Sequence, residues 1–163
     1  MTKLIDSWKQ HHNAFQKLNK QFVRKLKLRP PKKLDEIGGE LHEEVFSELD
    51  CLDCANCCKS IPPILNDNDI RRLSKSLGLS TGDFQNKYVR LDEDGDRVMA
   101  TTPCPFLMDD NACMVYEARP KACRQYPHTD RPQFVSSLKL HAANASYCPA
   151  VYHILQRLQK KLD

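Results

Sequence analysis

The sequence predicts a mainly α-helical protein with one small β-hairpin, in which irregular, cysteine-rich metal-binding loops pack on helices. Three observations lead to this fold class. Apolar residues recur at helical spacing in several segments, an Asp-Gly turn signal separates two short apolar runs, and eight cysteines fall in stretches without periodicity. With 163 residues, the chain is long enough for one domain with a core and too short for two ordinary domains plus linkers.

The N-terminal segment from about Leu4 to Leu28 is predicted to be an amphipathic helix. Its apolar stripe, spaced by three, four and seven residues, is Leu4, Trp8, Phe15, Leu18, Phe22 and Leu26. The pair Pro30-Pro31 ends this helix, because proline cannot continue the hydrogen-bond pattern. A second helix is expected over residues 34–49, although Gly38-Gly39 lower its helix propensity.

Charge divides the chain into a basic arm and an acidic body. Residues 1–33 carry ten Lys or Arg and one acid, Asp6, whereas residues 34–163 carry the other 15 basic and 20 acidic side chains. We therefore expect residues 1–33 to be a helical arm with a Pro-rich linker, and residues 34–163 to be a single cysteine-cluster domain. Trp8, Phe15 and Phe22 are expected to pack on the body or on a second subunit, because an exposed stripe of that size would promote association.

The middle of the chain carries two helix-capping signals. Asn66 or Asp67 can cap a helix that runs to Leu77, and Ser80 or Thr81 can cap the next helix. Both predicted helices have an apolar stripe on one face only. We therefore expect this region to contribute to a buried core.

Three further elements follow toward the C-terminus. Within residues 90–102, Asp94-Gly95 separates two short apolar runs and predicts a hairpin turn. The segment Glu117–Cys123 is expected to be a short helix despite an internal proline. A C-terminal helix is predicted over 146–162, with a buried stripe at helical spacing.

Four cysteines form a dense array at residues 51–58. Cys51, Cys54, Cys57 and Cys58 follow the pattern C-x2-C-x2-C-C. Two residues between cysteines allow a tight turn to direct both sulfurs at one centre, a spacing found in zinc knuckles and iron–sulfur proteins. The array therefore predicts metal binding.

Four more cysteines, Cys104, Cys113, Cys123 and Cys148, complete the set of eight candidate metal ligands. Eight thiolates would suit two tetrahedral zinc sites. An iron–sulfur cluster, such as a 4Fe-4S cluster, is the alternative, because Cys104 and Cys148 each precede proline and the first three cysteines match a ferredoxin-type run. The basic side chains next to these cysteines, which could offset the thiolate charge, are Lys59, Arg119, Lys121 and Arg124.

The adjacent pair Cys57-Cys58 adds a constraint. Neighbouring side chains in an irregular segment usually diverge and do not easily bind the same ion. We therefore expect the two thiols to serve different centres or different roles. A disulfide between them would be strained.

Features that the sequence lacks bear on where the protein is located and on which classes of enzyme it could belong to. Its first residues lack the apolar stretch and cleavage site typical of a secretory leader, and no run of about 18 apolar residues occurs. We therefore expect no membrane span and a cytoplasmic location. In that reducing compartment, eight cysteines favour metal over disulfides. No hydrolase or nucleotide-binding motif occurs, and the six histidines have no convincing ligand spacing.

The cysteine motifs resemble those of the bacterial YkgJ-type cysteine-cluster family of zinc- or iron-chelating domains. The resemblance rests on the C-x2-C-x2-C-C array, then Cys104-Pro-Phe-Leu, then the run from Cys113 to Pro120, then Cys123-Arg-Gln-Tyr-Pro. It covers about half of the chain, from Cys51 to Pro127. It implies that the seven cysteines from Cys51 to Cys123 bind the metal, while Cys148 lies outside the matched pattern.

Three functions are compatible with this sequence. The first is a metal-binding protein that holds an iron–sulfur cluster or Zn²⁺ through cysteine thiolates. The second is an iron–sulfur-dependent redox or protein-modifying enzyme, which would need an open cleft beside the cluster. The third is a zinc-folded adaptor whose basic N-terminal arm binds nucleic acid or a protein partner.

Overall fold

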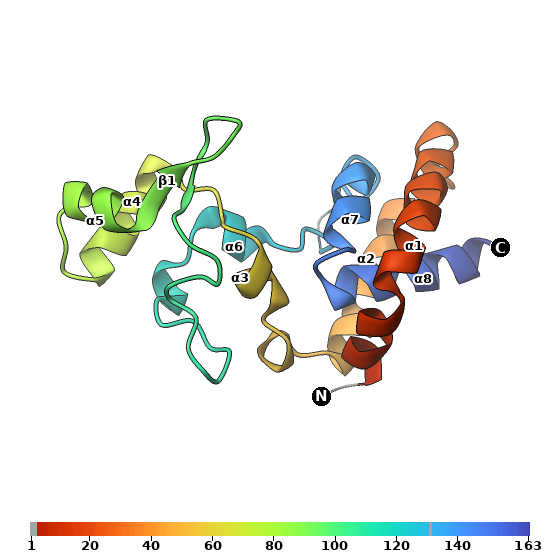
Figure 1. Cartoon of the computed structure of the whole chain (residues 1–163). Coiled ribbons are helices and arrows are strands. Elements are labelled where there is room, and N and C mark those ends of the chain that lie inside the picture. Colours follow the sequence, from red (N-terminus) through yellow and green to blue (C-terminus); the bar gives the residue numbers. More distant parts are fainter. Residues whose placement is uncertain (1–2, 131) are drawn as a thin grey trace. The chain divides into compact units, whose positions relative to one another are not determined.

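The computed structural model describes residues 3–130 and 132–163, and these residues form a mainly helical protein (Figure 1). Within them lie eight α-helices, two 3₁₀ helices and one two-stranded antiparallel sheet. The predicted fold class, mainly α with one small hairpin, is confirmed. The chain divides into two compact units. Unit 1 comprises Met1–Cys54 and Pro127–Asp163, and unit 2 comprises Ala55–Tyr126.

Unit 1 is built from helices at both ends of the chain. They are α1 (Lys3–Leu28), α2 (Leu34–Glu48), the 3₁₀ helix η1 (Cys51–Asp53), α7 (Leu138–Asn144) and α8 (Pro149–Leu162). Helix α8 packs on both α1 and α2, and α7 packs on α1 and α8. Figure 1 shows these segments, distant in sequence, lying side by side.

The apolar face of α1 belongs to the core of unit 1. Trp8 is only 5% exposed and donates a hydrogen bond from Nε1 to the carbonyl of Ala145, 3.0 Å away. Phe15 and Phe22 are partly buried against the same core. The prediction that these three aromatic side chains pack on the body is therefore confirmed. Leu18 departs from the predicted stripe, because 48% of its surface is exposed.

Helix α8 supplies the centre of this core. The four residues predicted as its buried stripe, Val151, Ile154, Leu155 and Leu158, are fully buried. The helix begins at Pro149 and not at Ser146, because Cys148 is the N-cap residue and proline suits the first helical position. Helix α7 was not predicted, since its N-cap residue Ser137 makes no side-chain capping bond and gives no clear start signal.

Unit 2 contains shorter elements. They are α3 (Asn56–Ser60), α4 (Asp67–Ser76), α5 (Thr81–Tyr88), strands β1 (Val89–Leu91) and β2 (Arg97–Met99), the 3₁₀ helix η2 (Tyr116–Ala118) and α6 (Lys121–Gln125). Asn66 caps α4 through a capping box, and Ser80 caps α5. Both caps were predicted from the sequence.

The predicted hairpin is present. Strand β1 pairs antiparallel with β2, with Val89 opposite Met99, and Gly95 adopts a positive φ of 82° in the turn. The predicted single helix over Glu117–Cys123 is wrong, because Arg119 and Pro120 leave helical geometry and separate η2 from α6. A second core, made of Leu65, Ile70, Leu73, Phe84, Met99, Phe106, Val115 and Ala118, lies entirely within unit 2.

The boundaries of the compact units differ from the predicted domain organisation. The division into an arm over residues 1–33 and one domain over residues 34–163 stays a prediction. In the structure, α1 packs within unit 1 against α7 and α8. None of the helices described is both long enough and apolar enough to cross a membrane.

The glycine pair in α2 has two different environments. A Cβ atom at Gly38 would lie 2.5 Å from Cγ of Phe134, which is fully buried, whereas a Cβ at Gly39 would meet nothing within 4 Å. Helix α2 therefore tolerates two glycines because one of them is needed for the close approach of an aromatic ring. The other has no such packing reason.

We predict opposite effects from alanine at these neighbouring positions. Gly38→Ala should destabilise the protein by about 1–3 kcal/mol, because the added methyl group would displace Phe134 in a packed core. Gly39→Ala, the matched control, should stabilise it by about 0.5–1 kcal/mol through helix propensity alone. Urea unfolding measures both changes, and equal effects of the two substitutions would contradict the packing assigned to Gly38.

Candidate metal centre

The eight cysteines all lie in described residues, and none of them forms a disulfide. The structure sorts them by unit. Cys51, Cys54 and Cys148 belong to unit 1, and Cys57, Cys58, Cys104, Cys113 and Cys123 belong to unit 2. The C-x2-C-x2-C-C array is therefore divided between Cys54 and Ala55, where one compact unit gives way to the other.

Four cysteines of unit 2 form what we call the unit-2 thiol group, namely Cys58, Cys104, Cys113 and Cys123. They come from α3, from the loop after β2, from the turn before η2 and from α6, respectively. All four side chains are half-buried. Segments separated by up to 65 residues thus contribute thiols to one region of a small unit.

Backbone hydrogen bonds hold three of these segments together. The backbone N–H of Cys104 donates to the carbonyl of Cys58 over 2.8 Å, which joins the loop to α3. Leu107 and Cys113 form an isolated antiparallel bridge, which closes the loop between Cys104 and Cys113. These ties are independent of the sulfur atoms, so the backbone itself places the thiols near one another.

The thiols of this group interact through their charges. Burial is the main cause that raises the pKa of the Cys123 thiol to about 12, and the other three thiols of the group add to the rise. Burial also raises the pKa of Cys104 and of Cys113, and the Cys58 charge contributes in both cases. Four ionised sulfurs would therefore destabilise one another unless a cation lay between them.

Backbone N–H groups favour the ionised form of the same sulfurs. The N–H groups of Phe106 and Leu107 lower the pKa of Cys104, and that of Val115 lowers the pKa of Cys113, against the larger effect of burial. Hydrogen bonds from backbone amides to sulfur are a feature of iron–sulfur sites, where they tune the reduction potential. The Cys104-Pro-Phe-Leu and Cys113-Met-Val turns therefore suit metal-bound thiolates.

Two of the four expected basic neighbours act on these thiols. Lys59 lowers the pKa of Cys58, and Arg119 lowers the pKa of Cys113 and Cys123. The Arg119 guanidinium stacks on the Tyr116 ring, 3.5 Å from the ring centre. Arg119 is therefore the residue of the predicted set that is best placed to offset negative charge on a tetrathiolate centre.

A second group of thiols lies in unit 1 and comprises Cys51, Cys54 and Cys148. Cys54 and Cys148 pack against the unit 1 core, and Cys51 is exposed on η1. Burial raises the pKa of Cys148 to about 12, and the charges of Cys51 and Cys54 add to this rise. Cys148, which lay outside the family pattern recognised in the sequence, is thus grouped with the first two cysteines of the array.

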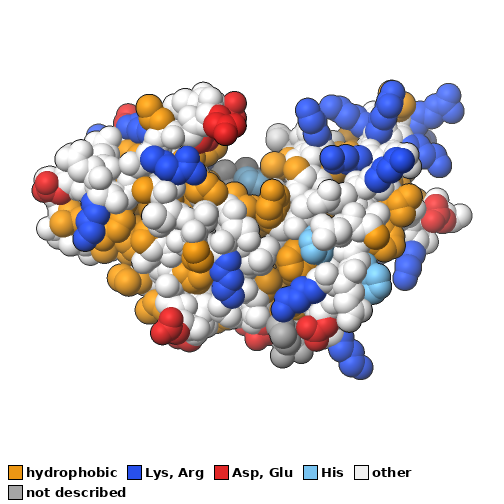
Figure 2. Space-filling model, viewed as in Figure 1, with side chains coloured by type: hydrophobic (Ala, Val, Ile, Leu, Met, Phe, Trp, Pro, Cys, Tyr) orange, Lys and Arg blue, Asp and Glu red, His pale blue; other side chains and the backbone are white. Residues whose placement is uncertain are grey.

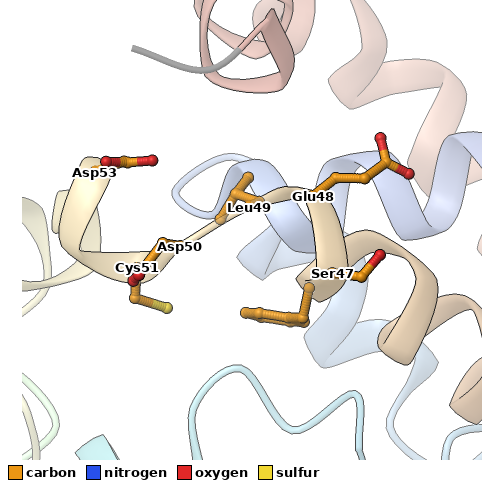
Figure 3. A pocket seen from close by; sticks show the side chains of 7 residues that line it. Ser47, Glu48, Leu49, Asp50, Cys51 and Asp53 are labelled. Carbon is orange, nitrogen blue, oxygen red and sulfur yellow. The ribbon is translucent and has the colours of Figure 1, made fainter.

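An open cavity of about 500 Å³ borders this second group (Figure 3). It lies where α2 leads into η1, and its lining residues are Phe46, Ser47, Glu48, Leu49, Asp50, Cys51 and Asp53. In Figure 3 the Cys51 sulfur and the Asp53 carboxylate leave the chain on different sides of this segment. Cys51 is therefore the one cysteine among the residues that line this cavity.

The adjacent cysteines Cys57 and Cys58 are in contact without a disulfide. Their sulfurs are 4.0 Å apart, too far for a disulfide bond of about 2.05 Å. The hydrogen bond with Cys57 and the charge of Lys59 lower the pKa of Cys58 to about 7, although burial opposes them. Charge interactions link Cys58 to the other members of the unit-2 thiol group.

The donor set is chemically suited to zinc or to an iron–sulfur cluster, both of which are bound by thiolates. The described sulfurs are near one another without surrounding one point: among residues 3–130 and 132–163, no three His, Cys, Asp or Glu side chains form a group arranged to hold a metal ion. Metal binding would therefore draw the side chains of an already assembled backbone closer together.

The histidines have the structural roles expected of them where their partners are defined. His153 bonds through Nε2 to the carbonyl of Leu4 at 2.8 Å, and His42 bonds through Nδ1 to Thr129 Oγ1 at 2.8 Å. His141 is fully buried against Phe134, and burial lowers its pKa to about 4. These three side chains therefore contribute to unit 1 packing.

Comparison with known families agrees with the cysteine chemistry. A family model called CxxCxxCC, described as "Putative zinc- or iron-chelating domain", matches residues 50–149, which is 100 of the 163 residues. The matched range contains all eight cysteines, including Cys148. No curated protein and no solved structure gives a significant match to the chain.

We predict that serine substitutions at the adjacent cysteines have unequal effects. Cys58→Ser should release the metal of the unit-2 thiol group, because it removes one of four thiolates, whereas Cys57→Ser should retain that metal. Metal content per chain, measured by elemental analysis after gel filtration, distinguishes the two variants. Identical metal loss from both would contradict the division of the cysteines described above.

Proposed function

Because the chain belongs to the CxxCxxCC family of zinc- or iron-chelating domains, we propose that the unit-2 thiol group binds one metal centre as four thiolates. The observation that carries this proposal is the convergence of four distant cysteines within one unit. The Cys104–Cys58 backbone bond joins two of their segments. The effect of the other three thiols on the pKa of Cys123 indicates that all four lie close together. Four thiolates match a tetrahedral zinc site or a four-iron cluster.

Of these two kinds of metal centre, zinc or a four-iron cluster, we favour a 4Fe-4S cluster. Cubane clusters take one thiolate on each of four irons, so their ligand sulfurs stand farther apart than four sulfurs around a single ion. The described thiols interact by charge across segments that are far apart in the sequence, so the group has the four separate thiolates that such a cluster needs. The Cys104-Pro pair and the backbone N–H groups that face sulfur also support this choice.

The three thiols of unit 1 support a second site for metal. Cys148 precedes Pro149 and is the N-cap of α8, where the N–H groups of Val151 and Ala150 favour its thiolate form. With Cys51 and Cys54 it offers three thiolates. The two groups contain seven of the eight cysteines, and Cys57, next to Cys58, is the remaining candidate ligand. A reducing compartment such as the cytoplasm would keep all eight thiols available.

Isolation without oxygen tests the identity of the metal. We expect brown protein that contains iron and acid-labile sulfide, and that loses its unit 2 structure when a chelator removes the metal, because metal binding contributes directly to folding in such centres. Colourless protein with stoichiometric zinc under the same conditions would assign zinc instead. Metal-free protein that stays folded with disulfides would contradict metal binding altogether.

A second function is favoured by the charges on α1. Lys17, Lys20, Arg24 and Lys27 are exposed at helical spacing on α1, beside the buried face that holds Val23 and Leu26, and we call them the basic stripe. Figure 2 shows Lys and Arg side chains gathered over this end of α1. Among the described residues, no carboxylate forms an ion pair with any of the four.

The partner that fits the basic stripe best is a nucleic acid. Binding to a lipid surface by an amphipathic helix requires an apolar face that can enter the membrane, but the apolar face of α1 is buried against α7 and α8. Unpaired cations along one exposed face are suited to phosphates instead. An acidic protein partner would use the same charges without a requirement for phosphate.

Binding to a short, fluorescently labelled single-stranded RNA tests this second function. Changing Lys17, Lys20 and Arg24 together to glutamine should weaken binding. It should also reduce the slope of log K against log salt concentration by roughly 2, because each lost phosphate contact removes about 0.7 from that slope. The matched control changes the exposed unit 2 residues Lys75, Lys87 and Arg90 to glutamine. Equal loss in the control, or tighter binding to anionic vesicles than to RNA, would exclude the assignment.

A further inference from the structure

A buried carboxylate outside the cysteine motifs contacts the segment that carries Cys123. Asp69, on α4, is only 1% exposed. Its Oδ1 accepts a hydrogen bond from the backbone N–H of Lys121 over 3.0 Å and another from Nη2 of Arg72 over 2.7 Å. Because a buried charge is stable only when it is paired, these donors are required by Asp69 itself.

Arg72 binds the backbone on the other side of Pro120, just before α6. Its Nη2 donates to the carbonyl of Arg119 over 2.6 Å, and its Nε donates to the carbonyl of Ala118 over 3.3 Å. The two α4 side chains thus bind the carbonyls before Pro120 and the N–H after it. We call this pair the Asp69–Arg72 clamp.

The clamp supplies a hydrogen-bond acceptor for the N-terminus of α6. Its N-cap residue is Pro120, which makes no side-chain capping bond, and the first N–H groups of any helix have no partner within the helix. Asp69 provides an acceptor to the first of them from another element. Since α6 has only five residues, the position of Cys123 depends directly on how this first turn is held.

The clamp also fixes the position of Arg119. The carbonyl of this residue accepts a hydrogen bond from Arg72, and its guanidinium stacks on Tyr116. Arg119 thereby stays beside the thiols of Cys113 and Cys123, where its charge favours their ionised forms. One pair of side chains on α4 controls both a ligand and its counter-charge.

We propose that the Asp69–Arg72 clamp is a positioning device that sets the metal affinity of the unit-2 thiol group by holding Cys123 and Arg119 in place. This proposal rests on the proposed metal centre of unit 2. Neither clamp residue belongs to the cysteine motifs, and neither is itself a metal ligand. The clamp acts on the metal through Cys123, as outer partners of metal ligands commonly do.

The test compares neighbouring arginines on α4 in the full chain. Arg72→Met removes the three hydrogen bonds that Arg72 donates within the clamp. Arg71→Met, the matched control, removes an exposed side chain whose described partner is Asn68 on the same helix. Co²⁺ is the probe, because the same thiolates bind it and its absorption reports the number of sulfur ligands. Competition with a chelator gives the affinity.

We expect Arg72→Met to weaken Co²⁺ binding about 10–100-fold and to reduce the sulfur-to-cobalt absorption, which loss of stability alone would not do. Arg71→Met should stay within about twofold of the unchanged protein, and Arg72→Lys should fall between them because it keeps the charge without the forked geometry. If Arg72→Met does not fold, Asp69→Asn gives the same comparison with a smaller change.

Two failures can be told apart. If Arg72→Met, or Asp69→Asn in its place, binds Co²⁺ with unchanged affinity and spectrum, the clamp has no role in positioning and the inference is overturned. If Cys58→Ser binds Co²⁺ as the unchanged protein does, the proposed metal centre fails, and the clamp inference fails with it. Weakened binding by both Arg72→Met and Cys58→Ser supports both.

Discussion

Four thiols held close together by the backbone would repel one another when they ionise, and the metal centre proposed for unit 2 depends on how this repulsion is offset. Burial raises the pKa of Cys104, Cys113 and Cys123, and their mutual charges add to the effect. A cation bound between the sulfurs would offset the repulsion between thiolates and would take the place of the thiol protons. In this account, metal binding supplies free energy that unit 2, with its short helices and three-residue strands, cannot obtain from its apolar core alone.

The rest of unit 2 can be understood as a frame for these sulfurs. The Leu107–Cys113 bridge closes one loop, and the backbone bond from Cys104 to Cys58 joins that loop to α3. Helix α4 adds an ion pair between the buried Asp69 and the partly exposed Arg72, and this pair holds the turn before Cys123. Unit 1 differs, since α1, α2, α7 and α8 enclose a larger apolar core.

Local patterns in the sequence were sufficient where one physical signal dominated. The apolar period predicted α1 and α8, the Asn66 and Ser80 caps predicted α4 and α5, and Asp94-Gly95 predicted the hairpin. Prediction failed at Pro120, where one expected helix became two, and at α7, which lacks a capping signal. The cysteines themselves were evident, but their division was not, because the meeting of Cys148 with Cys51 and Cys54 depends on the packing of α8 against the N-terminal helices.

The most direct measurement for the central claim is X-ray absorption at the metal edge of a variant that keeps the unit-2 thiol group alone. In this variant Cys51, Cys54, Cys57 and Cys148 are all replaced by serine. The account predicts that the variant still binds metal and that each metal atom is coordinated by sulfur alone, from protein thiolates and, in a cluster, from sulfide. Loss of the metal, or nitrogen or oxygen atoms among its ligands, would contradict a centre built from Cys58, Cys104, Cys113 and Cys123.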